Sequence, residues 1–232
     1  MSATDPTPVP TPVYLDLASW HRRSAFEFFR GFDIPTFDLC ARLDVALLKQ
    51  AVRDLGVGSL SLAYHFIAIR LANEITPFRY RLEGERVRVH AAVHGSTTVL
   101  RDDDSFGFAT LEHNHDFSAF CAQGAAALAR GRLHGTPFEP NAHETAAIHM
   151  TTLPWVHFSS YSNARQWGPN DSIPKIAFGR IDADGARQWM PLSVEVHHAL
   201  MDGLHIGRYF ENFETALRDP ETWLRRGGMV AI

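Results

Sequence analysis

The hydrophobic pattern of this 232-residue chain changes its period repeatedly, and this limits the fold more than any other feature. Apolar residues recur at helical spacing in some segments and alternate with polar residues in others. The predicted helices span 44–55, 59–75, 116–130 and 206–217. The predicted strands span 35–44, 106–111, 147–152 and 155–161, with hairpins at 78–89 and 175–198. Helices and antiparallel hairpins mix without strict alternation, which predicts an α+β fold: a two-layer sandwich with helices packed on a large mixed, mostly antiparallel sheet.

Residues 1–12 contain the run TDPTPVPTP, which has no apolar face to bury and predicts a disordered tail. No comparable linker follows, so residues 13–232 are expected to form a single domain. With 45% hydrophobic and 21% charged residues, the bulk of the chain is not of the disordered class.

Composition also limits the partners and the compartment. No apolar stretch approaches the ~18 uncharged residues of a transmembrane helix, so no membrane association is expected. The net charge of −4 gives no basic face for nucleic acid. Two cysteines do not make a disulfide framework, and the N-terminus lacks the basic and apolar regions of a signal peptide. Together these features predict a cytoplasmic protein.

The predicted strand 192–198, Leu-Ser-Val-Glu-Val-His-His, ends on the candidate catalytic residue. The side chains on one face are apolar up to the last histidine: Leu192, Val194, Val196 and His198. The other face carries Ser193, Glu195 and His197. A histidine at a strand end, followed by Asp202 and a glycine, is a common way to aim a general base into a cleft.

Two other interpretations of this histidine pair stay open. His198 could be a core histidine satisfied by hydrogen bonds, without a catalytic role. His197 and His198 could bind a metal together with His205. Neighbouring strand side chains diverge, however, and no Cys or Glu cluster lies nearby in the sequence, so no metal is expected.

Three segments of the chain resemble the chloramphenicol acetyltransferase family. Residues 197–203, His-His-Ala-Leu-Met-Asp-Gly, match the HHxxxDG signature of CoA-dependent acyltransferases, and residues 190–208 around them resemble this family in particular. Residues 153–161 resemble its Pro-Trp-Val-x-Phe-x-Ser-Phe strand, and residues 20–29 its N-terminal helix. The match runs in order over residues 14–217. It implies the family's fold, acetyl-CoA as cosubstrate, a small-molecule hydroxyl acceptor and a homotrimer with active sites between subunits.

The resemblance also implies roles for single residues. His198 would be the general base that deprotonates the acceptor hydroxyl, whose oxygen then attacks the thioester carbonyl directly, without an acyl-enzyme. Ser160 would donate a hydrogen bond to the oxyanion, the alternative being an ordinary strand serine. Asp202 would pair with Arg22, or else with Arg23, to pin the turn after the base. It could also cap the helix that follows.

The expected acceptor pocket departs from the family. Phe29 stands where the family has a tyrosine and Ala177 where it has a threonine. Lys175 stands where an apolar residue lines the drug site, whereas Phe106 matches a pocket phenylalanine. A lysine in the pocket would favour a polar or anionic acceptor, unless its side chain points to solvent. Chloramphenicol O-acetylation, which confers antibiotic resistance, is the leading expectation; the alternatives are another acceptor or acyl-CoA, or a non-catalytic binding protein on this scaffold.

Overall fold

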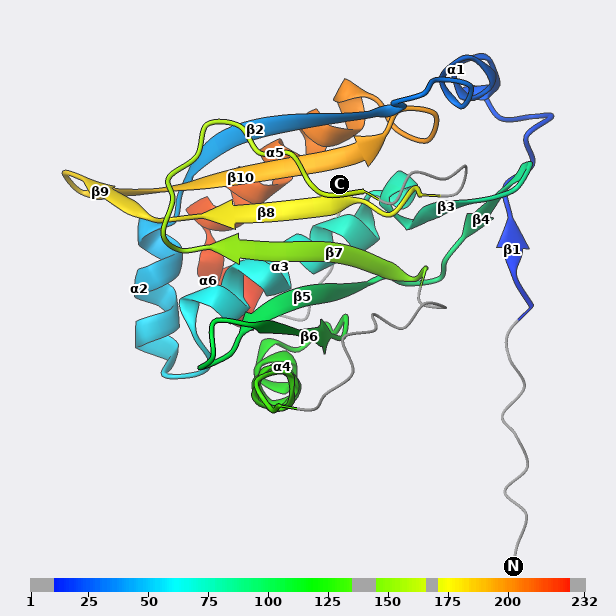
Figure 1. The fold of residues 1–232 in the computed structure, drawn as a ribbon. Coiled ribbons are helices and arrows are strands. Elements are labelled where there is room, and N and C mark those ends of the chain that lie inside the picture. The colour runs from blue at the N-terminus through cyan, green and yellow to red at the C-terminus, as the bar shows by residue number, and fades with distance from the viewer. Residues whose placement is uncertain (1–10, 135–144, 166–170, 226–232) are drawn as a thin grey trace, which may run out of the picture.

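The computed structural model describes residues 11–134, 145–165 and 171–225 (Figure 1). Most of the predicted tail therefore lies outside the described residues. The described residues form a large sheet with helices on one face and a small sheet at one end. This is the two-layer α+β arrangement that the sequence predicts.

The large sheet has seven strands, in the spatial order β2-β10-β8-β7-β5-β6, with β9 beside β10. Their bounds are β2 Thr36–Asp44, β5 His94–Leu100, β6 Phe106–Leu111, β7 Ala147–Leu153, β8 Lys175–Gly179, β9 Asp182–Asp184 and β10 Arg187–His197. The pairs β5–β7 and β7–β8 are parallel, and the other pairings of the described strands are antiparallel. The sheet is therefore mixed and mostly antiparallel.

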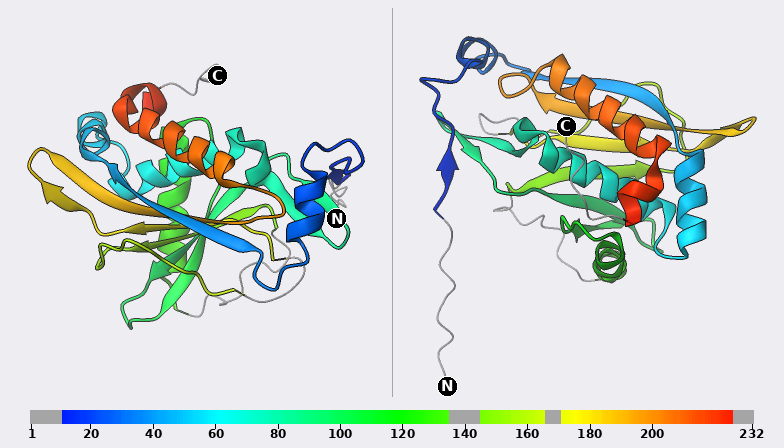
Figure 2. Two further views of the ribbon diagram at one scale, coloured as in Figure 1. Left: turned by 90° about the horizontal axis from the view of Figure 1, so that it is seen from above. Right: turned by 180° about the vertical axis from the view of Figure 1, so that it is seen from behind.

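Most of the helices cover the back face of this sheet (Figures 1 and 2). They are α1 Arg23–Phe29, α2 Ala46–Leu55, α3 Leu60–Glu74, the short 3-10 helix η1 Thr76–Arg79, α4 Phe117–Gly131, α5 Gly203–Arg218 and α6 Pro220–Arg225. α4 lies beneath β6, and α1 stands apart at the end where β2 begins and β10 ends. Among the described residues no single helix meets the length and apolarity of a membrane span; α2 and α3 do so only as a pair bent by 111°.

Local sequence sets where the helices begin and end. The side chains of Ser59 and Asp116 each accept from a backbone N–H three residues on, at 3.2 and 2.7 Å, and so cap α3 and α4. Gly56 ends α2 in the left-handed conformation, with φ of 63°, that glycine adopts without strain. The prediction that Asp44 begins α2 is early by one residue: Asp44 ends β2, and Val45 takes the cap position.

One predicted strand is wrong. Residues 155–161 join no ladder. They belong to residues 154–165, which cross the front face of the sheet, the face opposite α3 and α5 (Figure 1). We call residues 154–165 the covering segment. It lies close to the sheet because Gly179 has no side chain. A Cβ there would be 2.9 Å from the Phe158 ring and 3.0 Å from the Val156 carbonyl oxygen.

β5 and α6 are absent from the prediction, as are the short elements β1 (Val13–Tyr14) and η1. β5 contains a Gly-Ser-Thr-Thr run, which hides its alternation of buried and half-buried residues. α6 begins at Pro220, a residue that the sequence pattern places beyond the last helix. Proline is tolerated at the first helical position because the N–H that it lacks would have no partner within the helix.

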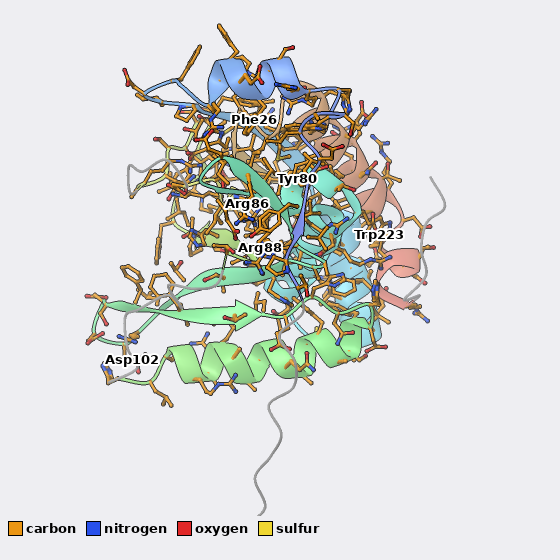
Figure 3. The ribbon with its side chains drawn as sticks, turned by 90° about the vertical axis from the view of Figure 1, so that its right-hand side faces the viewer. Phe26, Tyr80, Arg86, Arg88, Asp102 and Trp223 are labelled. Atoms are coloured by element: carbon orange, nitrogen blue, oxygen red, sulfur yellow. The ribbon has the colours of Figure 1, made fainter. Side chains whose placement is uncertain are left out.

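The small sheet packs against α1. It consists of β1 Val13–Tyr14, β4 Arg86–Val89 and β3 Tyr80–Glu83, and the predicted hairpin supplies β3 and β4. The Trp20 ring links it to α1, with centroids 5.9 Å from Phe26 and 6.0 Å from Tyr80 (Figure 3). This packing fixes α1, and with it Phe29, beside the end of β10.

Candidate active site

His198 directly follows the last residue of β10. Its backbone N–H donates to the Pro35 carbonyl at 2.7 Å, and its ring Nδ1 lies 3.1 Å from the Met201 carbonyl oxygen. A carbonyl oxygen only accepts, so Nδ1 carries the proton of this hydrogen bond and Nε2 keeps its lone pair in the neutral ring. The turn thus presents Nε2 as the basic nitrogen.

Aromatic rings surround this imidazole. Phe29 is stacked on it, with centroids 3.7 Å apart and planes 9° apart, and Phe37 lies 4.6 Å away at 47°. Phe28 and Phe32 pack on Phe29 and leave 63% and 45% of their surface exposed. We call these four phenylalanines the aromatic cluster. The phase of the strand predicts that His198 faces away from water. The structure instead leaves it half-buried beside the aromatic cluster.

Arg22 and Asp202 hold the turn that carries His198. Arg22 Nε donates to Asp202 Oδ2 at 3.1 Å, and its two other nitrogens lie 3.4 Å from the carbonyl oxygens of His198 and Ala199. Arg22 is 8% exposed and Asp202 37%. Burial opposes the ionisation of Asp202, but His205 and Arg22 outweigh it and hold the pKa of this carboxyl below its usual value.

Asp202 also caps α5. Its carboxylate accepts from a backbone N–H of the first helical turn at 3.2 Å, and His205 Nδ1 accepts from the Asp202 N–H at 3.1 Å, which completes a capping box. Asp202 is therefore both an ion-pair partner and a helix cap. Its partner is Arg22; Arg23 pairs with Glu27 on the surface instead.

His197 belongs to the same turn. It is 5% exposed, and its Nδ1 accepts from the Ala199 N–H at 3.2 Å. Burial, followed by the charge of Arg165, lowers its pKa to about 4, so the ring is neutral near pH 7. In the part of the chain that the structure describes, no group of three or more His, Cys, Asp or Glu side chains could hold a metal ion.

A pocket of about 380 Å³ opens on the front face of the sheet, beside β5, β6, β7 and β8. Its aromatic lining comprises Phe106, Phe108 and Tyr161, the last from the covering segment. Its polar lining includes His149, Lys175, Thr98 and Thr151. The two threonine hydroxyls lie 3.0 Å apart. The pocket thus combines aromatic walls with a polar floor.

Lys175 is buried in this pocket, so the alternative that it points to solvent is wrong. Its side chain is 8% exposed; Nζ donates to the Ala164 carbonyl at 2.6 Å and lies 3.8 Å from Asp171. Burial, followed by the charge of Arg165, lowers the pKa of Lys175. The ammonium group therefore already has partners within the chain and is not a free cation awaiting an anionic acceptor.

The other residues expected at the site lie outside the pocket lining. Ala177 is fully buried in β8, paired with Thr151 of β7. Ser160, expected to point inward from a strand, is exposed on the covering segment. Phe29 stacks on His198, and neither is among the lining residues. One chain therefore holds its basic nitrogen and its pocket in separate places.

Sequence reasoning misses most of the polar residues of the pocket, among them His149, Thr151 and Thr98. His149 and Thr151 lie two residues apart in a predicted strand, so the alternation of that strand could have placed both on one face. Thr98 could not be found, because β5 was not predicted. Burial, followed by the charge of Lys175, lowers the pKa of His149 to about 4, so this ring is also neutral near pH 7.

Known sequences match the chain over most of its length. The family model for chloramphenicol acetyltransferase matches residues 13–214. The chloramphenicol acetyltransferase of Streptomyces acrimycini is 30% identical over 220 residues, which cover 94% of this chain and 99% of that protein. Chloramphenicol acetyltransferase 3 of Escherichia coli is 24% identical over 200 residues, or 86% and 93% of the two chains.

Solved structures share the fold. A chloramphenicol acetyltransferase superposes with a TM-score of 0.78 at 21% identity and covers 89% of this chain and 100% of its own. The dihydrolipoamide acetyltransferase of Azotobacter vinelandii gives a TM-score of 0.63 at 14% identity, covering 95% and 94%. These structures establish the fold, and the sequence matches establish the family. The chain belongs to the chloramphenicol acetyltransferase family.

Proposed function

We propose that the chain transfers the acetyl group of acetyl-CoA to a hydroxyl of chloramphenicol, with His198 as the general base. Family membership supports the reaction, and the names of the relatives support the acceptor. The observation that carries the proposal is the hydrogen bond between His198 Nδ1 and the Met201 carbonyl, which leaves Nε2 to take a proton. A positioned base of this kind contributes about 10²–10⁴-fold in rate.

The proton and the acetyl group move in two steps. Nε2 of His198 takes the proton of the acceptor hydroxyl while the hydroxyl oxygen attacks the thioester carbonyl, so that a C–O bond forms and the carbonyl oxygen becomes an oxyanion. When the oxyanion collapses, the C–S bond breaks and His198 returns its proton to the departing thiolate. The products are an acetyl ester and free CoA, and no Ser or Cys nucleophile takes part.

The oxyanion needs a hydrogen-bond donor, and two hydroxyl groups are candidates. Ser160 is the residue implied by the resemblance, and its exposure leaves it open to a neighbouring subunit. Thr151 lies in the pocket, where its hydroxyl already meets that of Thr98. We favour Thr151, because its hydroxyl lines the proposed acceptor pocket, whereas Ser160 is not among the lining residues.

We propose that the pocket binds the acceptor and that the protein is a homotrimer with active sites between subunits. The aromatic walls suit the ring of chloramphenicol, and the threonines and His149 suit its polar groups. His198 is not part of its own chain's pocket, so a base from a second subunit would complete the site. The exposed rings of Phe28 and Phe106, at 63% and 41%, supply apolar surface for such a contact.

We propose the cytoplasm as the compartment and chloramphenicol resistance as the biological outcome. Cys40 and Cys121 are both free thiols, which fits a reducing compartment. Resistance follows if acetylation of the drug's hydroxyl removes its activity in the cell.

The test is release of free thiol from acetyl-CoA with and without chloramphenicol, for the wild-type chain and for His198→Ala. We expect drug-dependent thiol release that falls by about 10²–10⁴-fold in the variant. The variant should bind acetyl-CoA and melt as the wild type does, because His198 is half-buried and outside the core. Full turnover by His198→Ala would refute the assignment of the base.

The same chemistry on another acceptor is the second candidate. His149 and Lys175 make the pocket floor more polar than an all-apolar drug site, and Phe29 has no hydroxyl to offer a substrate. A panel of alcohols in the same assay separates the two candidates. Thiol release with another alcohol but not with chloramphenicol would assign the second.

A further inference from the structure

We propose that Glu195 is a positioning residue for the acceptor pocket. Through Asn163 and Arg165 it holds the wall segment, residues 161–165, one part of which lines the pocket. The proposal rests on the proposed function for the identity of the acceptor; the geometry of the wall stands independently of it.

The wall segment belongs to no helix or strand. Tyr161, Asn163 and Ala164 line the pocket, facing residues of the sheet such as Phe106 and Phe108. Ladder hydrogen bonds would hold a strand at a fixed distance from its neighbour, but this segment has none. Its distance from the sheet therefore depends on the side chains that join the two.

Glu195 lies on the front face of β10, 6% exposed, and receives the wall segment at three points. Its Oε2 accepts from the backbone N–H of Asn163 at 3.3 Å and from Asn163 Nδ2 at 2.7 Å. Its Oε1 accepts from Arg165 Nε. Burial alone would raise the pKa of Glu195, but these bonds from Arg165 and Asn163 outweigh it and lower the pKa. The carboxylate is thus a charged anchor for Asn163 and Arg165 of the wall segment.

A second anchor adjoins the first. Lys175 of β8 donates to the Ala164 carbonyl at 2.6 Å, and Arg165 Nη1 lies 3.2 Å from Asp171 Oδ1. Two cations and two carboxylates therefore balance in a largely buried network: Arg165, Lys175, Glu195 and Asp171. Such a network is a poor way to gain stability, because desolvation offsets the attraction and apolar packing would serve as well. It does fix geometry, and here the geometry it fixes is the width of the pocket.

The consequence differs from that of a catalytic residue. Glu195 is not among the residues that line the pocket. Its carboxylate bonds to the wall segment and touches no reacting atom. Loosening the wall would lower the affinity for the acceptor. It would leave proton transfer at His198 and the binding of acetyl-CoA unchanged.

The test compares Glu195→Gln, which keeps the shape and removes the charge, with Asn163→Ala, which leaves the Arg165–Glu195 pair intact. Glu74→Gln is the matched control, since Glu74 pairs with the buried Arg70 on α3, on the other face of the sheet. We expect the chloramphenicol KM to rise about tenfold or more in Glu195→Gln, because this variant weakens hydrogen bonds that a charged group accepts. The rise should be smaller in Asn163→Ala, which keeps the bond between Arg165 and Glu195. The kcat and the acetyl-CoA KM should stay within about twofold of wild type, and the control should match wild type in all three constants.

Amide hydrogen exchange of residues 161–165 gives a second readout that needs no acceptor. Faster exchange there in both variants, but not in Glu74→Gln, supports the anchor. Unchanged exchange in a folded Glu195→Gln or Asn163→Ala overturns it, and faster exchange with an unchanged chloramphenicol KM overturns its link to the acceptor. If the wild type does not acetylate chloramphenicol, the proposed function fails, while the exchange experiment still decides the role of Glu195.

Discussion

The Phe29 ring lies parallel to the His198 imidazole, with centroids 3.7 Å apart. The stack and the Met201 carbonyl together fix the orientation of this ring, the proposed base. An aromatic pair is worth about 0.5–1.5 kcal/mol, so Phe29→Leu should lower kcat about two- to tenfold. Phe29→Tyr keeps the stack and should stay near wild type. Steady-state kinetics at saturating substrates measure this, with Phe32→Leu as the control that touches Phe29 and not the base. Undiminished kcat in Phe29→Leu would show that the stack does not orient His198.

The oxyanion donor can be assigned by three matched variants. Losing one such donor costs about 10²–10³-fold in kcat, and we expect this loss for Thr151→Val. Thr98→Val removes the same threonine–threonine hydrogen bond but leaves the Thr151 hydroxyl, so it should lose far less. Ser160→Ala should stay within a few-fold of wild type. The reverse ranking, with Ser160→Ala the most impaired, would give the role to Ser160.

Asp202→Asn should lower both stability and rate. A half-broken buried ion pair costs about 3–5 kcal/mol, but Asp202 is more than a third exposed and Asn still caps a helix, so we expect about 1–2 kcal/mol. Denaturant unfolding measures the difference. The folded-state pKa of Asp202 is lowered from 3.8, so the pair stabilises the fold above that pH and its contribution is lost as pH falls below it. Wild type and variant should therefore converge in acid. A rate loss without any stability loss would contradict a structural role.

Buried and half-buried histidines predict a loss of stability in acid at pH values above the titration range of Asp202. Burial is the first cause that lowers the pKa to about 4 in five of them: His65, His90, His113, His149 and His197. An unfolded histidine titrates near 6.5, so between about pH 6.5 and 4 the unfolded chain binds more protons and the free energy of unfolding falls as pH falls. We expect the free energy of unfolding to fall by several kcal/mol, as an order of magnitude, between pH 7 and 5. Each histidine contributes about 1.4 kcal/mol per unit by which its pKa is lowered.

Urea unfolding at a series of pH values measures this loss. His149→Gln should make the dependence shallower, and His21→Gln, at an exposed residue, should leave it unchanged. A wild-type stability that is flat from pH 7 to 5 would contradict the neutral, buried state of these rings.

The sequence predicts the β10 strand well, for a physical reason. Leu192, Val194 and Val196 point to the face that the helices cover and join the core, as the period of two predicts. Ser193, Glu195 and His197 on the other face are buried as well. The same rule fails for residues 155–161. In this segment Phe158 is buried between the exposed Val156 and Ser160, so its burial has no period of two. A short apolar run in the sequence does not show whether its backbone joins a ladder.

The candidate site also has a part that the sequence predicts and a part that it does not. The turn from His197 to Asp202 is local, so a short motif carries most of its geometry. Arg22 lies 180 residues from Asp202, and only the resemblance brings the two together in the sequence. The surroundings of Lys175 depend on Ala164 and Asp171, whose positions follow from the path of the covering segment. No periodicity in the sequence encodes that path. The sequence alone therefore leaves open whether the side chain of Lys175 points into the pocket or to solvent.

The bare backbone at Gly179 constrains how this protein can diverge. The covering segment rests directly on it, so even a methyl group there would push Phe158 and Val156 outward, and the wall of the pocket would follow. Descendants of this chain can exchange the polar residues around the pocket one at a time and so explore new acceptors. They cannot fill this one position without displacing the covering segment from the sheet.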